Sequence, residues 1–189
     1  MPAKPTKDPL ALDLRTGLPD ALRVLLEDYP RAGWPDEPGY AGLVQFWLDR
    51  HMMFRRILDR LRAEAALCAD HKLDPDAYRA ALSRHGSAFV SELHGHHRIE
   101  DVHYFPTLMT KEARIATGFD LLDRDHQALD GHLEAFVQAA NATLGAPQAS
   151  AAAFHDHLRA LERVLDRHLI DEEELVVPVI LKYGASGLV

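Results

Sequence analysis

Two stretches of the sequence pair a histidine with a glutamate at the same spacing and end in a proline. The stretch HHRIEDVHYFP begins at residue 96, and HLIDEEELVVP begins at residue 168. In each, the glutamate follows the first histidine by four residues, as His96 with Glu100 and His168 with Glu172. On a helix this spacing places both side chains on one face. Because imidazole and carboxylate together bind transition-metal ions, the pattern predicts metal binding.

Residues around both pairs indicate that this face is buried. In the second stretch the pair belongs to a stripe with alternating steps of four and three: Phe154, Leu158, Leu161, Leu165, His168, Glu172, Leu175 and Val179. The first stretch repeats the alternation with Phe89, Leu93, His96, Glu100 and His103. Such a stripe is typical of a packed helix. A buried carboxylate without a partner costs on the order of several kcal/mol or becomes protonated, so a partner such as a divalent cation is required.

Two single histidines, His51 and His126, occupy equivalent positions in the apolar stripes of two other predicted helices. Each follows a similar phrase, LDRH in one case and LDRDH in the other, which indicates an internal repeat. Each half of the chain then supplies one single histidine and one His-xxx-Glu pair. Two helical hairpins related by a pseudo-twofold axis would bring four histidines and two glutamates together midway along a bundle. This set of nitrogen and oxygen ligands suits iron or manganese better than zinc.

The helices that must position these residues are long and amphipathic. We predict helices at about residues 42–70, 75–104, 120–144 and 151–183, with Pro106 ending or kinking the second. A loop containing Gly118 precedes the third helix, the short loop GAPQAS follows it, and Gly184 is the expected stop of the last. The predicted fold class is therefore all-α, an antiparallel up-down four-helix bundle. The bundle would span residues 42–184, with residues 185–189 as a tail.

Residues 1–41 are predicted to form an N-terminal extension or cap. Seven prolines interrupt this segment, leaving room for one short helix from Leu18 to Asp28. Its apolar residues need a surface to cover: Leu12, Leu14, Leu18, Leu22, Leu25, Leu26 and Trp34. That surface is either the bundle or a second subunit, so a homodimer stays open.

Composition excludes several classes of protein. A chain of 189 residues is long enough for one substantial core, so we expect one domain. The formal net charge of -8 argues against a nucleic-acid partner. No apolar run approaches the roughly 20 residues of a membrane span, and the first residues lack the apolar core of a secretion signal. The single cysteine, Cys68, fits a reducing compartment, so we expect a cytoplasmic protein.

From about Leu43 to Tyr183 the chain resembles the hemerythrin-like (HHE cation-binding) domain family, through its doubled His-xxx-Glu motif with a trailing proline. The resemblance implies a four-helix bundle that holds a non-haem di-iron centre, with manganese or zinc as less favoured metals. It assigns His51 and His96 to one iron, His126 and His168 to the other, and Glu100 and Glu172 as bridges. A solvent-derived oxo or hydroxo bridge would complete the pair and leave room for a small molecule.

The sequence departs from the oxygen carriers of that family on the third helix. Those proteins have a His-xxx-His pair there, and here Asp130 occupies the second position. Either one iron is more open or Asp130 adds a carboxylate. Both alternatives argue against reversible oxygen storage.

A ferritin-like carboxylate site is the competing interpretation. Glu100 and His103 have the Glu-xx-His spacing of that class, but the second copy has Leu175 in place of His103. His103 stays open as an additional or supporting ligand. The remaining histidines are expected at the surface or at packing edges, including His94 and His97. Residues expected either to face solvent or to orient the imidazoles are Asp101, Glu173 and Glu174.

Three functions are compatible with such a centre. The leading hypothesis is a cytoplasmic di-iron protein that binds or reduces O2, NO or peroxide in sensing or detoxification. A second is an iron-handling protein that donates iron for iron-sulfur repair. A third is an interaction module whose shape responds to iron or redox state. The fold alone does not choose among them.

Overall fold

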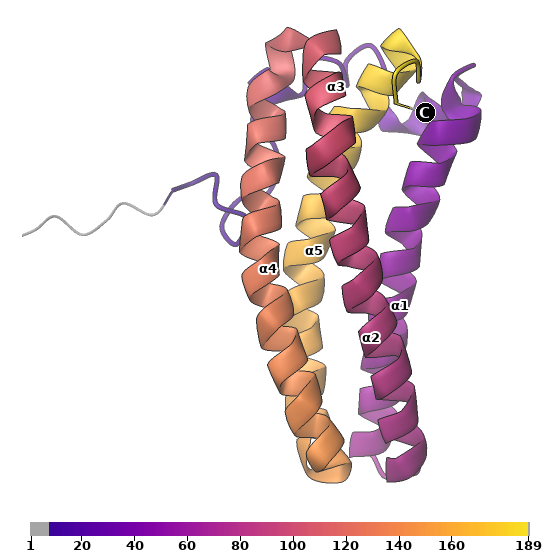
Figure 1. Cartoon of the computed structure of the whole chain (residues 1–189), viewed down its shortest axis with the longest axis vertical. Coiled ribbons are helices and arrows are strands. Elements are labelled where there is room, and N and C mark those ends of the chain that lie inside the picture. Colours follow the sequence, from indigo (N-terminus) through magenta and orange to yellow (C-terminus); the bar gives the residue numbers. More distant parts are fainter. Residues whose placement is uncertain (1–7, 189) are drawn as a thin grey trace, which may run out of the picture.

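The computed structural model describes residues 8–188, in which four long helices lie side by side as an elongated bundle (Figure 1). These helices are α1 (Gln45–Ala69), α2 (Pro75–Ile99), α4 (Ala116–Gly145) and α5 (Pro147–Tyr183). Helix α1 packs against α2 and α5, and α4 packs against the same two helices. There is no strand among the described residues, so the predicted all-helical class is confirmed. No helix within residues 8–188 is long and apolar enough to cross a membrane.

The ends of the long helices follow local chemistry. Asp74 caps α2 by accepting hydrogen bonds from the backbone N–H groups of Asp76 and Ala77, and Pro75 occupies the first turn. Helix α5 ends before Gly184, whose φ of +74° is easy only for glycine. The predicted GAPQAS loop is wrong, because α4 continues to Gly145 and α5 begins at Pro147.

Helix α4 also begins earlier than predicted, so Gly118 lies inside the helix and not in a loop. A Cβ atom at Gly118 would stand 2.9 Å from each of two methyl carbons of Leu175 on α5. Glycine is therefore required here by close helix packing. Because this requirement comes from a residue of the neighbouring helix, it cannot be predicted from the sequence around Gly118.

A π-helical turn, η4 (Glu100–Tyr104), joins α2 to the short helix α3 (Phe105–Lys111). Pro106 has no N–H to donate, and its ring crowds the carbonyl group four residues earlier, so a wider turn precedes it. The chain continues helically past Pro106, with the register changed by the wider turn. His103 is exposed, whereas the ring of Tyr104 packs 4.7 Å from Trp47. The prediction that His103 shares the inward face of His96 is therefore wrong.

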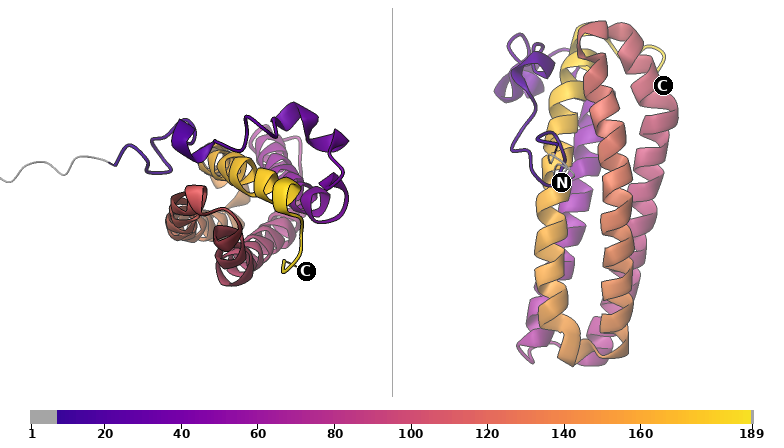
Figure 2. Two further views of the ribbon diagram at one scale, coloured as in Figure 1. Left: turned by 90° about the horizontal axis from the view of Figure 1, so that it is seen from above. Right: turned by 90° about the vertical axis from the view of Figure 1, so that its left-hand side faces the viewer.

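The N-terminal segment packs on the bundle beside α5 (Figure 2). The predicted helix from Leu18 to Asp28 is reduced to a single 3-10 turn, η1 (Asp20–Leu22), and a second 3-10 helix, η2 (Arg31–Asp36), follows. Pro19 immediately precedes η1, and Pro30 is the N-cap residue of η2, so neither 3-10 helix extends further toward the N-terminus. Leu18, Leu25 and Trp34 are buried in the same apolar cluster as the C-terminal part of α5.

Candidate metal centre

A layer of buried polar side chains separates two apolar clusters along the bundle. One cluster contains Phe54 and Leu165, and the other contains Trp47 and Leu175. The layer brings together all six predicted ligands, which are between 0% and 7% exposed: His51, His96, Glu100, His126, His168 and Glu172. Each comes from a different turn of α1, α2, η4, α4 or α5. Whether they bind metal stays a prediction.

The first group of side chains is His51, His96, Glu100 and Glu172, with one candidate ligand atom from each within 4.8 Å of the others. The Nε2 atoms of His51 and His96 lie 3.1 Å apart. His96 Nε2 is 2.9 Å from Glu100 Oε1, and His51 Nε2 is 3.4 Å from Glu172 Oε1. Two imidazoles and two carboxylates therefore face one point.

The second group is His97, His126 and His168, whose candidate ligand atoms also lie within 4.8 Å of one another. Glu100 Oε2 lies 3.6 Å from His126 Nε2, and Glu172 Oε2 lies 3.3 Å from His168 Nε2. Each carboxylate thus presents one oxygen to the first group and the other oxygen to the second. This is the arrangement by which two carboxylates can bridge two cations.

His97 was expected at the surface, and the structure shows that this expectation is wrong. It is 4% exposed, and its ring stacks on that of His126 with 4.0 Å between centroids. Helix α2 packs against both α1 and α4, so its buried stripe is wide enough for two adjacent residues. His96 lies near His51 of α1, while His97 faces α4. The signal that could have found it is the His-His pair itself.

Asp130, by contrast, lies away from both groups. Its side chain is 62% exposed, and its nearest charged partner is His94, at 3.6 Å on the surface of α2. The position that carries a second histidine in the oxygen carriers therefore faces solvent here. The third imidazole of the second group, beside His126 and His168, comes instead from His97 on α2.

The residues of this layer fit a pair of cations. Within residues 8–188, several of their buried atoms have no hydrogen-bond partner: both oxygens of Glu100, Glu172 Oε2, both ring nitrogens of His97, His126 Nε2 and His168 Nε2. Buried polar atoms in folded proteins are nearly always hydrogen-bonded. Unpartnered atoms concentrated at one place indicate a ligand with positive charge. Nitrogen and oxygen donors without thiolate suit iron or manganese.

The protonation of the metal-free layer is uneven. Burial, together with repulsion from Glu172, holds the pKa of Glu100 well above its usual value. Burial opposes ionisation of Glu172 as well, but His51 and His168 stabilise its charge and hold its pKa well below the usual value. Burial alone would lower the pKa of His168, yet the nearby carboxylates of Asp125 and Glu172 raise it to about 9. The negative charge of Glu172 is thus balanced by protonated His168, whereas a negative charge on Glu100 would have no such partner.

Carboxylates outside the layer orient three of the imidazoles. The Nδ1 atom of His51 lies 2.9 Å from Glu173, and that of His126 lies 2.7 Å from Asp101. The sequence left open whether Glu173 and Asp101 face solvent or orient the imidazoles. These contacts favour the orienting role for both. The third contact, His168 Nδ1 to Asp125 at 3.4 Å, was not foreseen. Such contacts fix which ring nitrogen is free for a metal.

Two further features were not predicted. The indole Nε1 of Trp47 donates a hydrogen bond to Glu172 Oε1, so Trp47 positions a carboxylate in addition to filling the core. Glu174 contacts Arg23 of the N-terminal segment at 3.1 Å and orients no imidazole.

A groove of about 470 Å³ between α1 and α2 leads to the layer. Its lining includes His96, Trp47, Tyr104, Phe46 and Ile99 together with the paired Arg50 and Glu92, so most of the surface around this candidate ligand is apolar. His96 is the most exposed of the predicted ligands, at 7%. This opening suits a small, weakly polar molecule.

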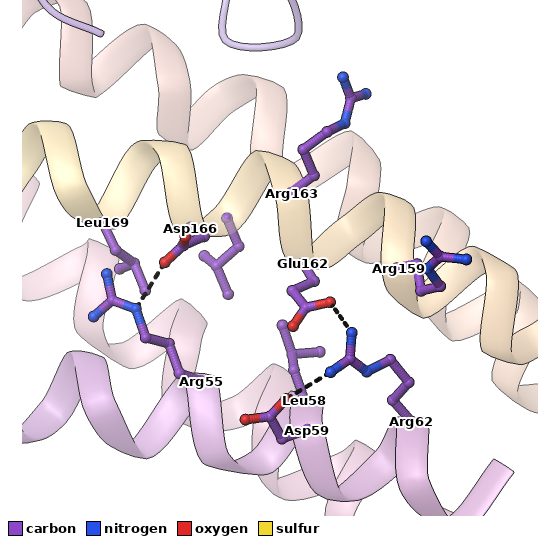
Figure 3. Close-up of a pocket in the computed structure, with 10 residues that line it drawn as sticks. Arg55, Leu58, Asp59, Arg62, Arg159, Glu162, Arg163, Asp166 and Leu169 are labelled. Atoms are coloured by element: carbon purple, nitrogen blue, oxygen red, sulfur yellow. Dashed lines mark hydrogen bonds and ion pairs between the residues drawn. The ribbon is translucent and has the colours of Figure 1, made fainter. Parts of the chain in front are cut away.

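Another groove, of about 540 Å³ between α1 and α5, lies outside the layer (Figure 3). Its charged side chains largely neutralise one another, since Arg62 pairs with Asp59 and Glu162 and Arg55 pairs with Asp166. It offers none of the histidines of the candidate centre.

Comparison with protein families gives a match to the Hemerythrin HHE cation binding domain over residues 42–180. Comparisons with curated proteins and with solved structures give no match. The matched range contains every histidine and glutamate of the two groups and begins after the N-terminal segment.

Proposed function

The chain belongs to the hemerythrin HHE cation-binding domain family, and we propose that it is a di-iron protein that binds or reduces a small ligand such as O2, NO or peroxide. The scaffold is an antiparallel up-down bundle in this proposal. The observation that carries it is the double-facing placement of Glu100 and Glu172, each with one oxygen toward each histidine group.

The ligand assignment follows from this geometry. His51 and His96 would hold one iron, and His126 and His168 would hold the other, with Glu100 and Glu172 shared. His97 stands beside the second iron as a further imidazole donor. Iron in such a centre supplies reversible one-electron redox chemistry. An oxo or hydroxo bridge between the two ions belongs to the same proposal.

The protein's own residues favour a small ligand over a large one. Candidate ligands that are at most 7% exposed cannot be reached by an organic substrate without opening the bundle. The groove that reaches His96 has a mostly apolar lining, and its charged residues Arg50 and Glu92 pair with each other, so it admits uncharged small molecules more readily than ions. The buried carboxylates also argue for retention of the metals, because releasing them would leave Glu100 buried without a partner and force it to take up a proton. Retention favours ligand chemistry over iron donation.

The test compares two histidines of α2, the buried His96 and the exposed His94. The purified full-length protein is loaded with Fe(II) without oxygen, and iron is counted by elemental analysis. Visible absorption is then recorded before and after exposure to O2 or NO. We expect two irons per chain and absorption bands that change with the gas. His96→Ala should lose iron and the spectral change, whereas His94→Ala should keep both.

Several outcomes would contradict the proposal. A wild-type chain that retains no iron, or a His96→Ala variant with full iron content, would exclude the assigned centre. Rapid loss of iron to a mild chelator, with no spectral response to either gas, would instead favour the iron-donating function.

A further inference from the structure

We propose that the N-terminal segment, residues 8–41, helps to build the metal centre through two positioning residues, Arg15 and Arg31. Both precede the range matched by the family, which begins at residue 42. Each holds a carboxylate that contacts the Nδ1 atom of a candidate ligand histidine. The inference rests on the proposed di-iron centre and extends it to residues outside the bundle.

Arg15 connects the segment to α4 and α5 in the interior of the protein. Its side chain is only 2% exposed. The Nε atom donates to Asp171 of α5 at 2.7 Å, and Nη1 donates to Asp125 of α4, also at 2.7 Å. Nη2 donates to the second oxygen of Asp125, so the guanidinium holds that carboxylate with two parallel bonds. This bidentate geometry fixes the plane of the carboxylate.

The Asp125 carboxylate continues this contact to the centre. Its Oδ2 atom lies 3.4 Å from Nδ1 of His168. A carboxylate at that position keeps the proton of His168 on Nδ1 and leaves Nε2, which faces Glu172, free for the metal. Without Arg15, Asp125 would be a buried carboxylate with one weak contact, and it would no longer hold a single orientation.

Arg31 makes the equivalent connection on the other side of the centre. It donates to Oε2 of Glu173, while Oε1 of the same carboxylate lies 2.9 Å from Nδ1 of His51. Here the arrangement has a second support, because Arg55 of α1 also donates to Glu173 Oε1 at 2.9 Å. Loss of Arg31 should therefore have a smaller effect than loss of Arg15.

The segment also contains a matched control. Arg23 contacts Glu174 of α5 at 3.1 Å, and Glu174 touches no candidate ligand histidine among the described residues. Arg23→Met removes a contact between the same segment and the same helix. It leaves both carboxylate-to-histidine contacts in place.

The experiment measures the affinity of each iron separately in the full-length protein. Metal-free wild type, Arg15→Met, Arg31→Met and Arg23→Met are titrated with Fe(II) without oxygen, against a competing chelator. Arg15→Met should weaken one of the two irons by about 10–100-fold and leave the other near its wild-type affinity. Arg31→Met should weaken the other iron by less, and Arg23→Met should weaken neither.

Two additional variants guard against a simple folding defect. Arg15→Lys keeps the positive charge but lacks the planar fork that holds both oxygens of Asp125 while Nε bonds Asp171, so its affinity should be intermediate. Arg15→Met combined with Asp125→Asn removes the unpaired charge and keeps an oxygen for His168 Nδ1, so it should recover part of the lost affinity. Melting temperatures of the metal-free proteins report any purely structural effect.

The inference is overturned if Arg15→Met leaves both iron affinities at the wild-type values, whether or not its melting temperature falls. It is also overturned if Arg15→Met and Arg23→Met weaken both irons equally. A wild-type chain that binds no iron would instead refute the proposed function.

Discussion

Replacing Glu100 with glutamine should change the stability of this protein in opposite directions with and without metal. Glu100 is fully buried, and neither of its oxygens has a hydrogen-bond partner within residues 8–188. Removing the charge spares the metal-free fold an unpartnered buried carboxylate, a gain of about 1–3 kcal/mol. The new amide can donate to the unpartnered Oε2 of Glu172. For a chain of this size, about 2 kcal/mol corresponds to a rise in melting temperature of about 4–8 °C.

With iron present the order should reverse. The wild type gains about 2.7 kcal/mol when free iron exceeds the dissociation constant a hundredfold. Glu100→Gln loses a shared carboxylate and should gain little from iron. The assay is thermal unfolding followed by circular dichroism, with and without Fe(II) under nitrogen. The matched control is Glu92→Gln, since Glu92 is a half-exposed residue of α2 that pairs with Arg50. It should shift neither curve by more than about 0.5 kcal/mol.

The metal-free comparison has a defined pH dependence. The pKa of Glu100 in the folded protein lies above its unfolded value of 4.5. Below pH 4.5 the Glu100 carboxyl group is protonated in both the folded and the unfolded state, so its ionisation does not change the free energy of unfolding. Above pH 4.5 the unfolded state ionises more readily than the folded state, so the loss of stability grows as the pH rises. The advantage of Glu100→Gln should therefore be largest at neutral pH and shrink toward pH 4.5. The reasoning would be refuted if Glu100→Gln were less stable than wild type both with and without iron. It would also be refuted if the metal-free variant and the metal-free wild type had the same stability at every pH.

Three further substitutions test separate parts of the structure. His97→Leu should reduce the iron content from two toward one per chain by elemental analysis, with His94→Leu as the exposed control, and an unchanged content would exclude ligation by His97. Asp130→Asn should keep both irons, because the aspartate faces solvent, and loss of an iron would show that it reaches the centre. Gly118→Ala should lower the free energy of unfolding in urea by about 1–3 kcal/mol, since its methyl group would collide with Leu175, and wild-type stability would contradict that packing.

Periodicity predicted the long helices and the inward position of the six candidate ligands. On α1, the residues that continue the stripe of His51 at alternating steps of four and three are all buried: Trp47, His51, Phe54, Leu58, Leu61 and Ala65. The prediction worked because long, regular helices keep one face toward the core over many turns. It also placed both His-xxx-Glu pairs in one layer, since the internal repeat relates the two hairpins.

Features that depend on neighbouring helices could not be predicted in this way. The inward position of His97 depends on the contact of α2 with two helices at once, and a single stripe assumes only one. The exposure of His103 depends on the π turn before Pro106, which changes the register after Glu100. A proline signals a disturbance in a helix, but it does not specify whether the chain stops, bends or widens there.

The distribution of arginines separates the structural carboxylates from those available to metal. Of the outer carboxylates around the centre, Asp125, Asp171 and Glu173 are each held by an arginine of the N-terminal segment, and Asp101 contacts His126. In the described part of the chain, the only basic side chains within 4.0 Å of the inner carboxylates Glu100 and Glu172 are histidines. An arginine beside them would have neutralised the layer without a metal. The arginine side chains of the N-terminal segment thus contact the outer carboxylates and not Glu100 or Glu172. Bound cations can therefore balance the charge of this inner pair.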